Sequence, residues 1–288
     1  KSAPSTALFN WYPGHMAKAL REIKQKLNLV DLVLEIRDAR APQATGNREL
    51  NLAAKKRIIV LNKANLTDAG AMTKWASWFD KQDEPHIFVN ALDKAALKKI
   101  MVMARKMVEA QRLINNPSYV EKQNKLRLMI VGLPNTGKST IINQLASKGT
   151  AKVADKPGQT KIQQWVDAGD GIQFLDTPGI MPPKIDSPEH ALWLSAVHAI
   201  PDDVANEEET AIFLAKHLLA MGSPEFMSRY QLKSKDMTVD EVFVQIATLR
   251  GCLRQQGLPD LDRVHKLLLA EFRKGELGKT CFGVPPLS

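Results

Sequence analysis

A glycine-rich stretch at residues 132–140 carries the clearest chemistry in this sequence. It reads Gly-Leu-Pro-Asn-Thr-Gly-Lys-Ser-Thr and fits the pattern G-x-x-x-x-G-K-[ST]. The backbone N–H groups of such a loop cradle nucleotide phosphates, the lysine reaches the β- and γ-phosphates, and the next hydroxyl binds Mg²⁺. The residues predicted to surround the phosphates are Pro134, Asn135, Thr136, Gly137, Lys138, Ser139 and Thr140.

A second motif of the same kind, Asp-Thr-Pro-Gly at residues 176–179, directly follows an apolar run. Asp176 is predicted to hold Mg²⁺, usually through water, and the Gly179 N–H to bind the γ-phosphate. Thr160, in Lys-Pro-Gly-Gln-Thr, is predicted to supply a second hydroxyl ligand of Mg²⁺ beside Ser139. Alone, Asp-x-x-Gly is often just a turn, but at this spacing after a phosphate loop it indicates a GTPase type of site.

The base-reading motif of ordinary GTPases, Asn-Lys-x-Asp, lies downstream of Asp-x-x-Gly, and this chain has no match there. The nearest match is Asn-Lys-Ala-Asn at 62–65, upstream of the phosphate loop. The next apolar run ends in Asn-Ala at 90–91, where a backbone N–H is expected to meet guanine O6. The residues predicted to face the base are Asn62, Lys63, Asn65, Asn90 and Ala91. Because loops at the carboxyl edge of one sheet meet whatever their order, the sequence predicts a circularly permuted GTPase domain.

Apolar and amphipathic runs indicate the elements that position these loops. Strands are predicted at 31–37, 57–61, 86–90, 126–131 and 172–175, and helices at 17–27, 71–81, 94–113 and 139–145. The alternation predicts an α/β fold, a mostly parallel sheet with helices on both faces. After about residue 185 only helical periodicity remains, clearest at 239–254 and 261–273. We therefore predict a permuted GTPase domain with an N-terminal basic helix at 1–184, and a small all-α domain at 185–288, for which the resemblance given below implies RNA binding.

Composition narrows the class of protein. The chain has 288 residues, 44% of them hydrophobic, which is enough for one large domain or two moderate ones with cores. No apolar run approaches the ~20 residues that cross a bilayer, so no membrane span is predicted. The net charge of +9 favours a polyanionic partner, because each neutralised phosphate releases counterions. Cys252 and Cys281 form no metal-spaced pair and no disulfide framework.

Together the motifs resemble the RbgA/YlqF family of circularly permuted GTPases. The resemblance rests on Asn-Trp-Tyr-Pro-Gly-His-Met-Ala-Lys-Ala at 10–19, Asp-Ala-Arg-Ala-Pro at 38–42, the phosphate loop and Asp-Thr-Pro-Gly, and it covers essentially the whole chain. It implies a GTPase that acts in assembly of the large ribosomal subunit, is slow alone and is stimulated by that subunit. GTP or GDP and Mg²⁺ are the implied cofactors, and rRNA is the implied partner of the C-terminal helices. We expect a monomer away from the ribosome, in the bacterial cytoplasm or, alternatively, in the mitochondrial matrix or another organelle.

Two further residue roles follow from comparison with GTPases. Small GTPases orient the attacking water with a Gln just after Asp-x-x-Gly, but Ile180 stands here and cannot polarise water. In the resembling family a histidine of Pro-Gly-His-Met substitutes, so His15 joins Lys138, Thr160 and Gly179 as expected catalytic residues; its alternative role is packing or capping. Asn135 matches a subset of GTPases that bind K⁺ beside the phosphates in place of an arginine finger, the alternative being loop hydrogen bonding.

Asn65 departs from the base-reading pattern, in which an aspartate accepts hydrogen bonds from guanine N1–H and the 2-amino group. An amide offers one acceptor and one donor there, which costs roughly 2–4 kcal/mol of guanine preference. Xanthine, with a carbonyl at position 2, suits Asn better. Three interpretations stay open: weakened guanine binding raised on the ribosome, a substitute contact from Asp68, or a degenerate GTPase acting mainly as a binding module. Intact phosphate and Mg²⁺ elements favour the first.

Basic residues are concentrated on three stretches, where contacts to rRNA phosphates compete with the alternative of a solvated surface. They are Lys18, Arg21, Lys24 and Lys26; Lys98, Lys99, Arg105, Lys106 and Arg112; and Arg229, Lys233, Lys235, Arg250, Arg254, Arg263, Lys266, Arg273 and Lys274. Two other functions compete with a GTPase switch. One is an RNA-binding assembly factor with a degenerate site and little hydrolysis, favoured by Asn65. The other is an ATPase or kinase, which the permuted motif order argues against.

Overall fold

The computed structural model describes residues 14–47, 56–118, 125–146, 164–182, 185–202 and 204–287, with no side chains given at 14–16 and 164. Two compact units form: one takes in Lys1–Ile185 and Cys281–Ser288, and the other Asp186–Thr280. The last residues of the chain therefore belong to the first unit, whereas the sequence analysis grouped them with the C-terminal helices. Their contacts with the first unit, described below, give the physical reason.

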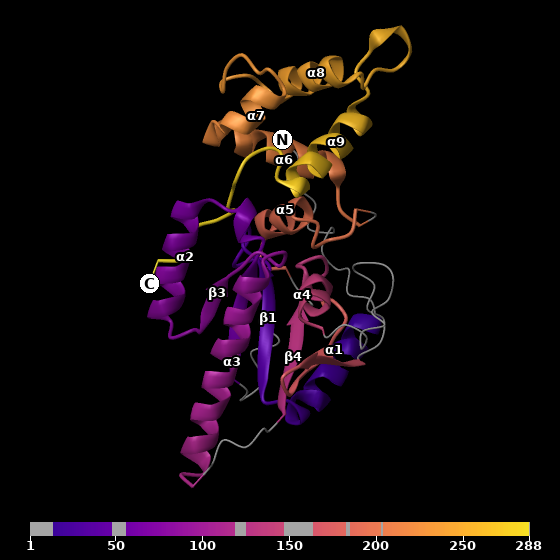
Figure 1. The fold of residues 1–288 in the computed structure, drawn as a ribbon. Helices are drawn as coiled ribbons and strands as arrows, with labels where there is room; N and C mark the ends of the chain where they lie inside the picture. The colour runs from indigo at the N-terminus through magenta and orange to yellow at the C-terminus, as the bar shows by residue number, and fades with distance from the viewer. Residues whose placement is uncertain are drawn as a thin grey trace. The chain divides into compact units, whose positions relative to one another are not determined.

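The first unit is built on a sheet in which six strands are described, in the order β3-β2-β1-β4-β6-β5. Figure 1 labels β1, β3 and β4 of this sheet. The strands are β1 (Leu32–Asp38), β2 (Arg57–Asn62), β3 (His86–Phe88), β4 (Leu126–Gly132), β5 (Gln164–Gly169) and β6 (Ile172–Asp176). All neighbours pair parallel except β5, which runs antiparallel to β6. The predicted α/β fold with a mostly parallel sheet is confirmed.

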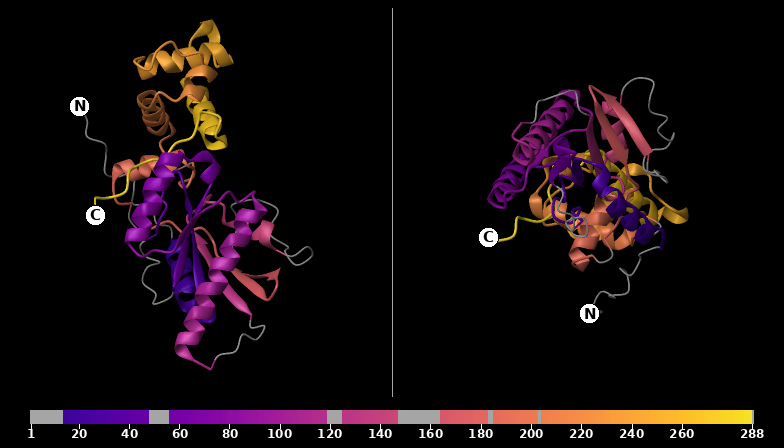
Figure 2. Two further views of the ribbon diagram at one scale, coloured as in Figure 1. Left: turned by 60° about the vertical axis from the view of Figure 1, so that its left-hand side comes forward. Right: turned by 90° about the horizontal axis from the view of Figure 1, so that it is seen from below.

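Helices cover both faces of this sheet (Figure 2). They are α1 (Gly14–Lys26), α2 (Ala69–Lys81), α3 (Lys94–Asn115) and α4 (Lys138–Leu145), and short 3₁₀ turns η2 (Leu27–Leu29) and η4 (Ala64–Leu66) lie between elements. Successive residues of β2 serve opposite cores: Ile58 and Val60 pack with α3 and α4, whereas Ile59 and Leu61 pack with α2. Because side chains alternate between faces, a strand buried on both sides needs the unbroken apolar run seen in the sequence.

The edge strand β5 was not predicted. Its sequence, Gln-Trp-Val-Asp-Ala-Gly, is short and alternates: Val166 is buried, whereas Trp165 and Asp167 are exposed. An edge strand with one open face lacks the continuous apolar run that marks its buried neighbours. It pairs antiparallel with β6 across the Asp170-Gly171 turn, both residues of which have positive φ, so this hairpin turn was the local signal that the sequence offered.

The second unit is helical in its described part, with α5 (Pro188–Ala196), α6 (Glu207–Met221), α7 (Pro224–Arg229), α8 (Val239–Arg250) and α9 (Leu261–Lys274). Helix α6 packs against α5, α8 and α9. The expected helix at 239–254 ends earlier, at Arg250, because Gly251 adopts a left-handed φ of 64° and caps it. The turn η5 (Gln255–Gly257) follows, inside a loop closed by a bridge between Leu253 and Pro259. None of the helices in the described ranges has the length and apolarity that a bilayer span requires.

Candidate nucleotide site

The predicted motifs converge at the carboxyl edge of the parallel strands. In the sheet register Asp38 pairs with Asn62, Ile36 with Gly132, and Ile130 with Asp176. Four strands, β1, β2, β4 and β6, therefore end beside one another. Loops far apart in the chain meet there, which is the usual ligand position in an open α/β sheet.

The phosphate loop turns sharply between β4 and α4, and two glycines allow the turn. Gly137 has a φ of +99°, and a Cβ at this residue would lie 2.1 Å from the Asn62 Nδ2 atom. A Cβ at Gly132 would lie 2.4 Å from the Ile36 carbonyl oxygen. Only glycine fits at either place. Helix α4 begins at Lys138, so its free N–H groups and positive dipole end lie at the loop, as an anionic ligand needs.

Lys138 is buried in this loop and donates from Nζ to the Leu133 carbonyl oxygen at 2.8 Å. Burial lowers the pKa of Lys138 to about 8, against the opposing effect of the Asp176 carboxylate. A phosphate bound here would supply a negative charge that stabilises the buried, protonated amine of Lys138. Ser139 and Thr140 are half-buried in the first turn of α4, as a phosphate and Mg²⁺ site needs.

The Asp-x-x-Gly turn packs directly on the phosphate loop. A Cβ at Gly179 would lie 2.8 Å from the Pro134 Cα atom, so glycine is needed for this approach. Asp176 ends β6 and is 1% exposed. Its carboxylate and the Ser139 hydroxyl are hard oxygen donors, the type that fits Mg²⁺. Ile180, by contrast, is buried in the core beside α1, so it contributes no polar group to the site.

The base-reading loops are tied to the phosphate loop by two side chains. Asn62 donates from Nδ2 to the Thr136 carbonyl at 2.9 Å and accepts at Oδ1 from the Ala91 N–H at 2.9 Å. Lys63 donates from Nζ to the Asn135 carbonyl at 2.8 Å. These hydrogen bonds link the loop after β2 to the phosphate loop and to the loop after β3. The Ala91 N–H, predicted to meet guanine O6, is donated to Asn62 here; the predicted contact remains untested.

Asn65 and Asp68 lie on the turn that follows. Asn65 is exposed in η4. Asp68 is exposed and caps helix α2, accepting at Oδ2 from the Ala71 N–H at 2.7 Å. Because capping uses one carboxylate oxygen of Asp68, a base contact from this residue would have to come from the other oxygen or disturb the cap. Asn90 accepts from the Leu92 N–H within its own loop.

Asp38 was overlooked as a site residue, although it belongs to the Asp-Ala-Arg-Ala-Pro motif. It is 1% exposed and accepts from Arg40 at 2.8 and 3.0 Å and from Lys63 at 2.9 Å. Burial by itself would raise the pKa of Asp38, but Arg40 and Lys63 hold it well below its usual range. The signal in the sequence was a pair of opposite charges directly after a buried apolar run.

Two of the predicted site residues lie wholly or partly outside the described residues. Thr160 is not described, and His15 is described only by its backbone, in the first turn of α1.

The basic residues that the sequence analysis singled out in the helical unit divide into two groups. The ion-paired ones are Arg229 with Glu271 and Glu276, Arg250 with Glu271, Arg254 with Asp260 and Asp262, Lys266 with Glu207, and Arg273 with Asp202. Lys233, Lys235, Arg263 and Lys274 are exposed and form no ion pair within the ranges described here. This second group keeps its charge available for an external anion.

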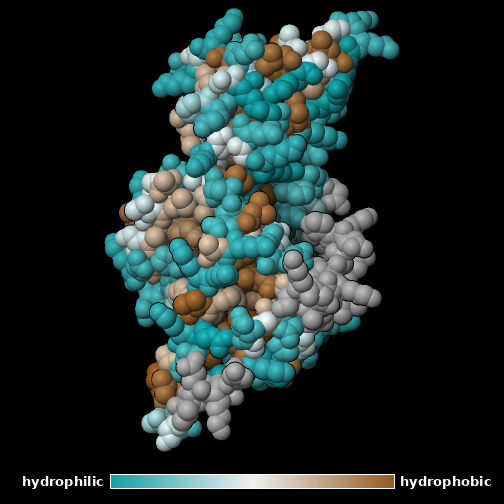
Figure 3. Space-filling view, in the orientation of Figure 1, coloured by the Kyte–Doolittle hydropathy of each residue, from teal (hydrophilic) through white to brown (hydrophobic). Residues whose placement is uncertain are grey.

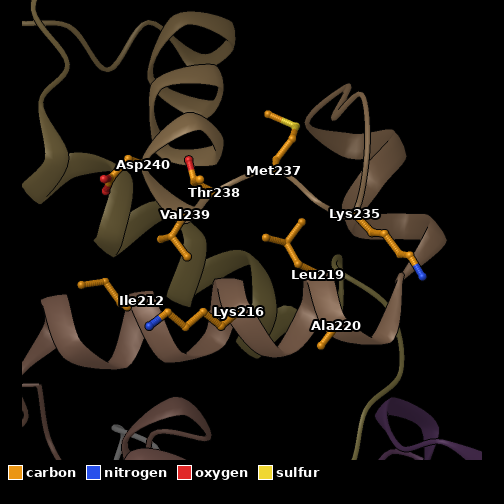
Figure 4. A pocket seen from close by; sticks show the side chains of 9 residues that line it. All are labelled: Ile212, Lys216, Leu219, Ala220, Lys235, Met237, Thr238, Val239 and Asp240. Carbon is orange, nitrogen blue, oxygen red and sulfur yellow. The ribbon is translucent and has the colours of Figure 1, made fainter.

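A cavity of about 560 Å³ lies in the helical unit between α6 and the start of α8 (Figure 4). Leu219 and Val239 face each other across it, whereas the Lys235 amine points away from the other labelled side chains. Lys216 and Asp240 also line it. On the face of the molecule shown in Figure 3, hydrophilic residues predominate and hydrophobic residues lie among them.

Known proteins match this chain over nearly its whole length. A family model described as a 50S ribosome-binding GTPase matches residues 127–242. Ribosome biogenesis GTPase A of Priestia megaterium is 35% identical over 96% of each chain. Mitochondrial ribosome-associated GTPase 1 of Ictalurus punctatus is 30% identical over 94% of this chain and 91% of its own length. The crystal structure of GNP-bound YlqF from T. maritima covers 93% of this chain and 98% of its own, with 31% identity and a TM-score of 0.66.

The strand order, the phosphate loop and the upstream base-reading loops define a circularly permuted P-loop GTPase fold. Within that class, the near full-length matches show that the chain belongs to the ribosome biogenesis GTPase A (RbgA/YlqF) family.

Proposed function

We propose that this protein is a GTP-hydrolysing switch that binds a precursor of the large ribosomal subunit through rRNA and acts in its assembly. The observation that carries the proposal is the single edge at which the phosphate loop, Asp176 and the base-reading loops meet. Family membership supports it, because relatives of similar length are named as ribosome biogenesis or ribosome-associated GTPases. The bacterial cytoplasm is the proposed location, with a mitochondrial setting as the alternative that the second relative supports.

Each group at the site has a proposed role in the reaction. The N–H groups of the phosphate loop and Lys138 bind the phosphates, and Gly179 donates to the γ-phosphate. Ser139, Thr160 and Asp176 hold Mg²⁺, which offsets the charge that develops on the leaving group when bound. His15 orients the attacking water, since the buried Ile180 cannot. A K⁺ ion at Asn135 is the proposed substitute for an arginine finger.

The decisive experiment is nucleotide turnover by the purified protein, with and without large ribosomal subunits, in KCl and in NaCl. We expect slow GTP hydrolysis alone, stimulation by the subunit, and faster turnover in KCl. A strong preference for ATP, or no turnover even with subunits, would contradict the proposal. The second outcome would favour the alternative, an RNA-binding factor whose nucleotide site is degenerate at Asn65.

A further inference from the structure

The C-terminal segment, from Cys281 onward, returns to the nucleotide-binding unit after the helical unit is complete. It lies beside α2 (Figure 1). The Phe282 N–H donates to the Arg40 carbonyl at 2.6 Å, and Phe282 is 1% exposed. Cys281 packs against Trp75 and Phe79 of α2, with Sγ 3.6 Å from the Ala39 carbonyl oxygen. The segment is therefore docked on the loop that follows β1.

That loop supports the base side of the nucleotide site. The Ala39 N–H donates to the Asn62 carbonyl at 2.7 Å. Asp38 accepts from both Arg40 and Lys63, and Lys63 in turn donates to the phosphate-loop carbonyl of Asn135. A continuous series of contacts thus runs from Phe282 to the phosphate loop. Because Asp38 and Arg40 are both 1% exposed, moving either charge without its partner is costly.

Thr280, the residue directly before this segment, is fixed in the helical unit. It is fully buried, and its Oγ1 lies 2.8 Å from His217 Nε2 and 3.2 Å from Met221 Sδ, both on α6. Three residues earlier, the Leu277 carbonyl accepts from the Ser223 hydroxyl at 2.7 Å. Consecutive residues, Thr280 and Cys281, therefore make their contacts in different units.

We propose that Cys281 and Phe282 form a strap through which the helical unit controls nucleotide affinity at the base side of the site. The proposal rests on the proposed function, in which the site binds guanine nucleotide and the helical unit binds an RNA-containing particle. Phe282 is a positioning residue: it holds the Asp38–Arg40 loop, which holds Lys63. We expect the strap to act on nucleotide retention and not on hydrolysis, because it contacts the loop after β1, whereas Asp176 and Gly179 follow β6.

Two variants of the full chain test this. Phe282→Ala removes the ring that anchors the strap, and we expect GDP to dissociate about tenfold faster, as for the loss of one buried contact. Single-turnover hydrolysis at saturating GTP should stay unchanged. Leu287→Ala, in the same segment but fully exposed, is the matched control and should behave as wild type.

The second variant inserts Gly-Ser-Gly-Ser between Thr280 and Cys281, which keeps both anchors and adds slack. Its GDP dissociation should match wild type in the free protein, but the change in dissociation rate caused by bound large subunits should disappear. The strap proposal is wrong if both variants behave as wild type. It is also wrong if Phe282→Ala loses hydrolysis activity to the same extent as it loses nucleotide affinity. If Phe282→Ala does not fold, the result for the insertion variant decides between these outcomes. Failure of the proposed function is distinct: the wild type itself would then bind no guanine nucleotide.

Discussion

Asn65 is the residue predicted to set how well the site reads a base. In the matching GTPase motif an aspartate accepts two hydrogen bonds from guanine at this position, and Asn65 is exposed in η4. For Asn65→Asp we expect GTP affinity to rise and XTP affinity to fall, with the GTP gain about 30- to 800-fold, the equivalent of roughly 2–4 kcal/mol. Binding titrations with GTP, XTP and GDP measure this.

Asp68→Asn is the matched control for that change, because asparagine caps a helix as well as aspartate does. Its GTP affinity should equal that of the wild type. If Asp68→Asn abolishes GTP binding while Asn65→Asp changes nothing, Asp68 reads the base instead.

Lys138 makes nucleotide binding depend on pH. In the free site burial lowers the pKa of Lys138 to about 8, and bound phosphates raise it. The complex therefore keeps a proton that the free protein loses, so affinity should fall as pH rises above about 8, by up to about tenfold per pH unit for one proton. Calorimetry in buffers of different ionisation enthalpy should show proton uptake on GDP binding at pH values above the pKa. Binding without proton uptake there would contradict the assignment.

His15 is the proposed water-orienting residue, and its role can be separated from nucleotide binding. His15→Ala should leave GTP affinity intact and reduce subunit-stimulated single-turnover hydrolysis by about 100-fold or more. His15→Gln should retain part of the rate, because glutamine orients water in other GTPases. Equal single-turnover rates for wild type and the alanine variant would remove His15 from the mechanism.

At the scale of elements, the residue that ends β2 links two of the loops that form the site. Asn62 is 2% exposed and links the phosphate loop to the loop after β3. Asn62→Ala leaves the Thr136 carbonyl and the Ala91 N–H without this partner, so we expect a loss of about 2 kcal/mol in stability and weaker GDP binding. Denaturant unfolding and GDP titration measure the two effects. Asn116→Ala, which removes a similar side chain-to-backbone bond at an exposed position, should change neither.

Among the strands, those buried on both faces could be predicted from the sequence. Strands β2 and β4 contain the unbroken apolar runs 58–61 and 128–131, because both of their faces are covered there, and these runs are visible in the sequence. Strand β5 was not predicted because one of its faces is open and its run is short and alternating, although it forms a local hairpin with β6 across the Asp170-Gly171 turn. The ion pair between Asp38 and Lys63 could not be predicted from local spacing. Arg40 is close to Asp38 in the sequence, but Lys63 comes near Asp38 only because β1 pairs with β2.

At the scale of the whole molecule, the net charge of +9 should make subunit binding strongly dependent on salt. Lys235→Ala and Lys233→Ala, which remove exposed charges, should each weaken binding and reduce the salt slope by about one. Arg254→Ala is the matched control, because Asp260 and Asp262 already balance its charge. Dissociation constants measured across a salt series check this. A flat series, or an equal effect of all three variants, would contradict an rRNA interface formed by the unpaired charges.

The sequence by itself determined the class of site and its permuted order, because phosphate binding needs specific residues at fixed local spacing on a strand–loop–helix turn. It also predicts that Asn65 weakens base recognition, since that prediction follows from donors and acceptors alone. Only the tertiary structure decided which charges remain available, which contacts join the base loops to the phosphate loop, and that Cys281 and Phe282 return to the first unit. Those properties depend on pairings between residues far apart in the chain, which no local spacing specifies.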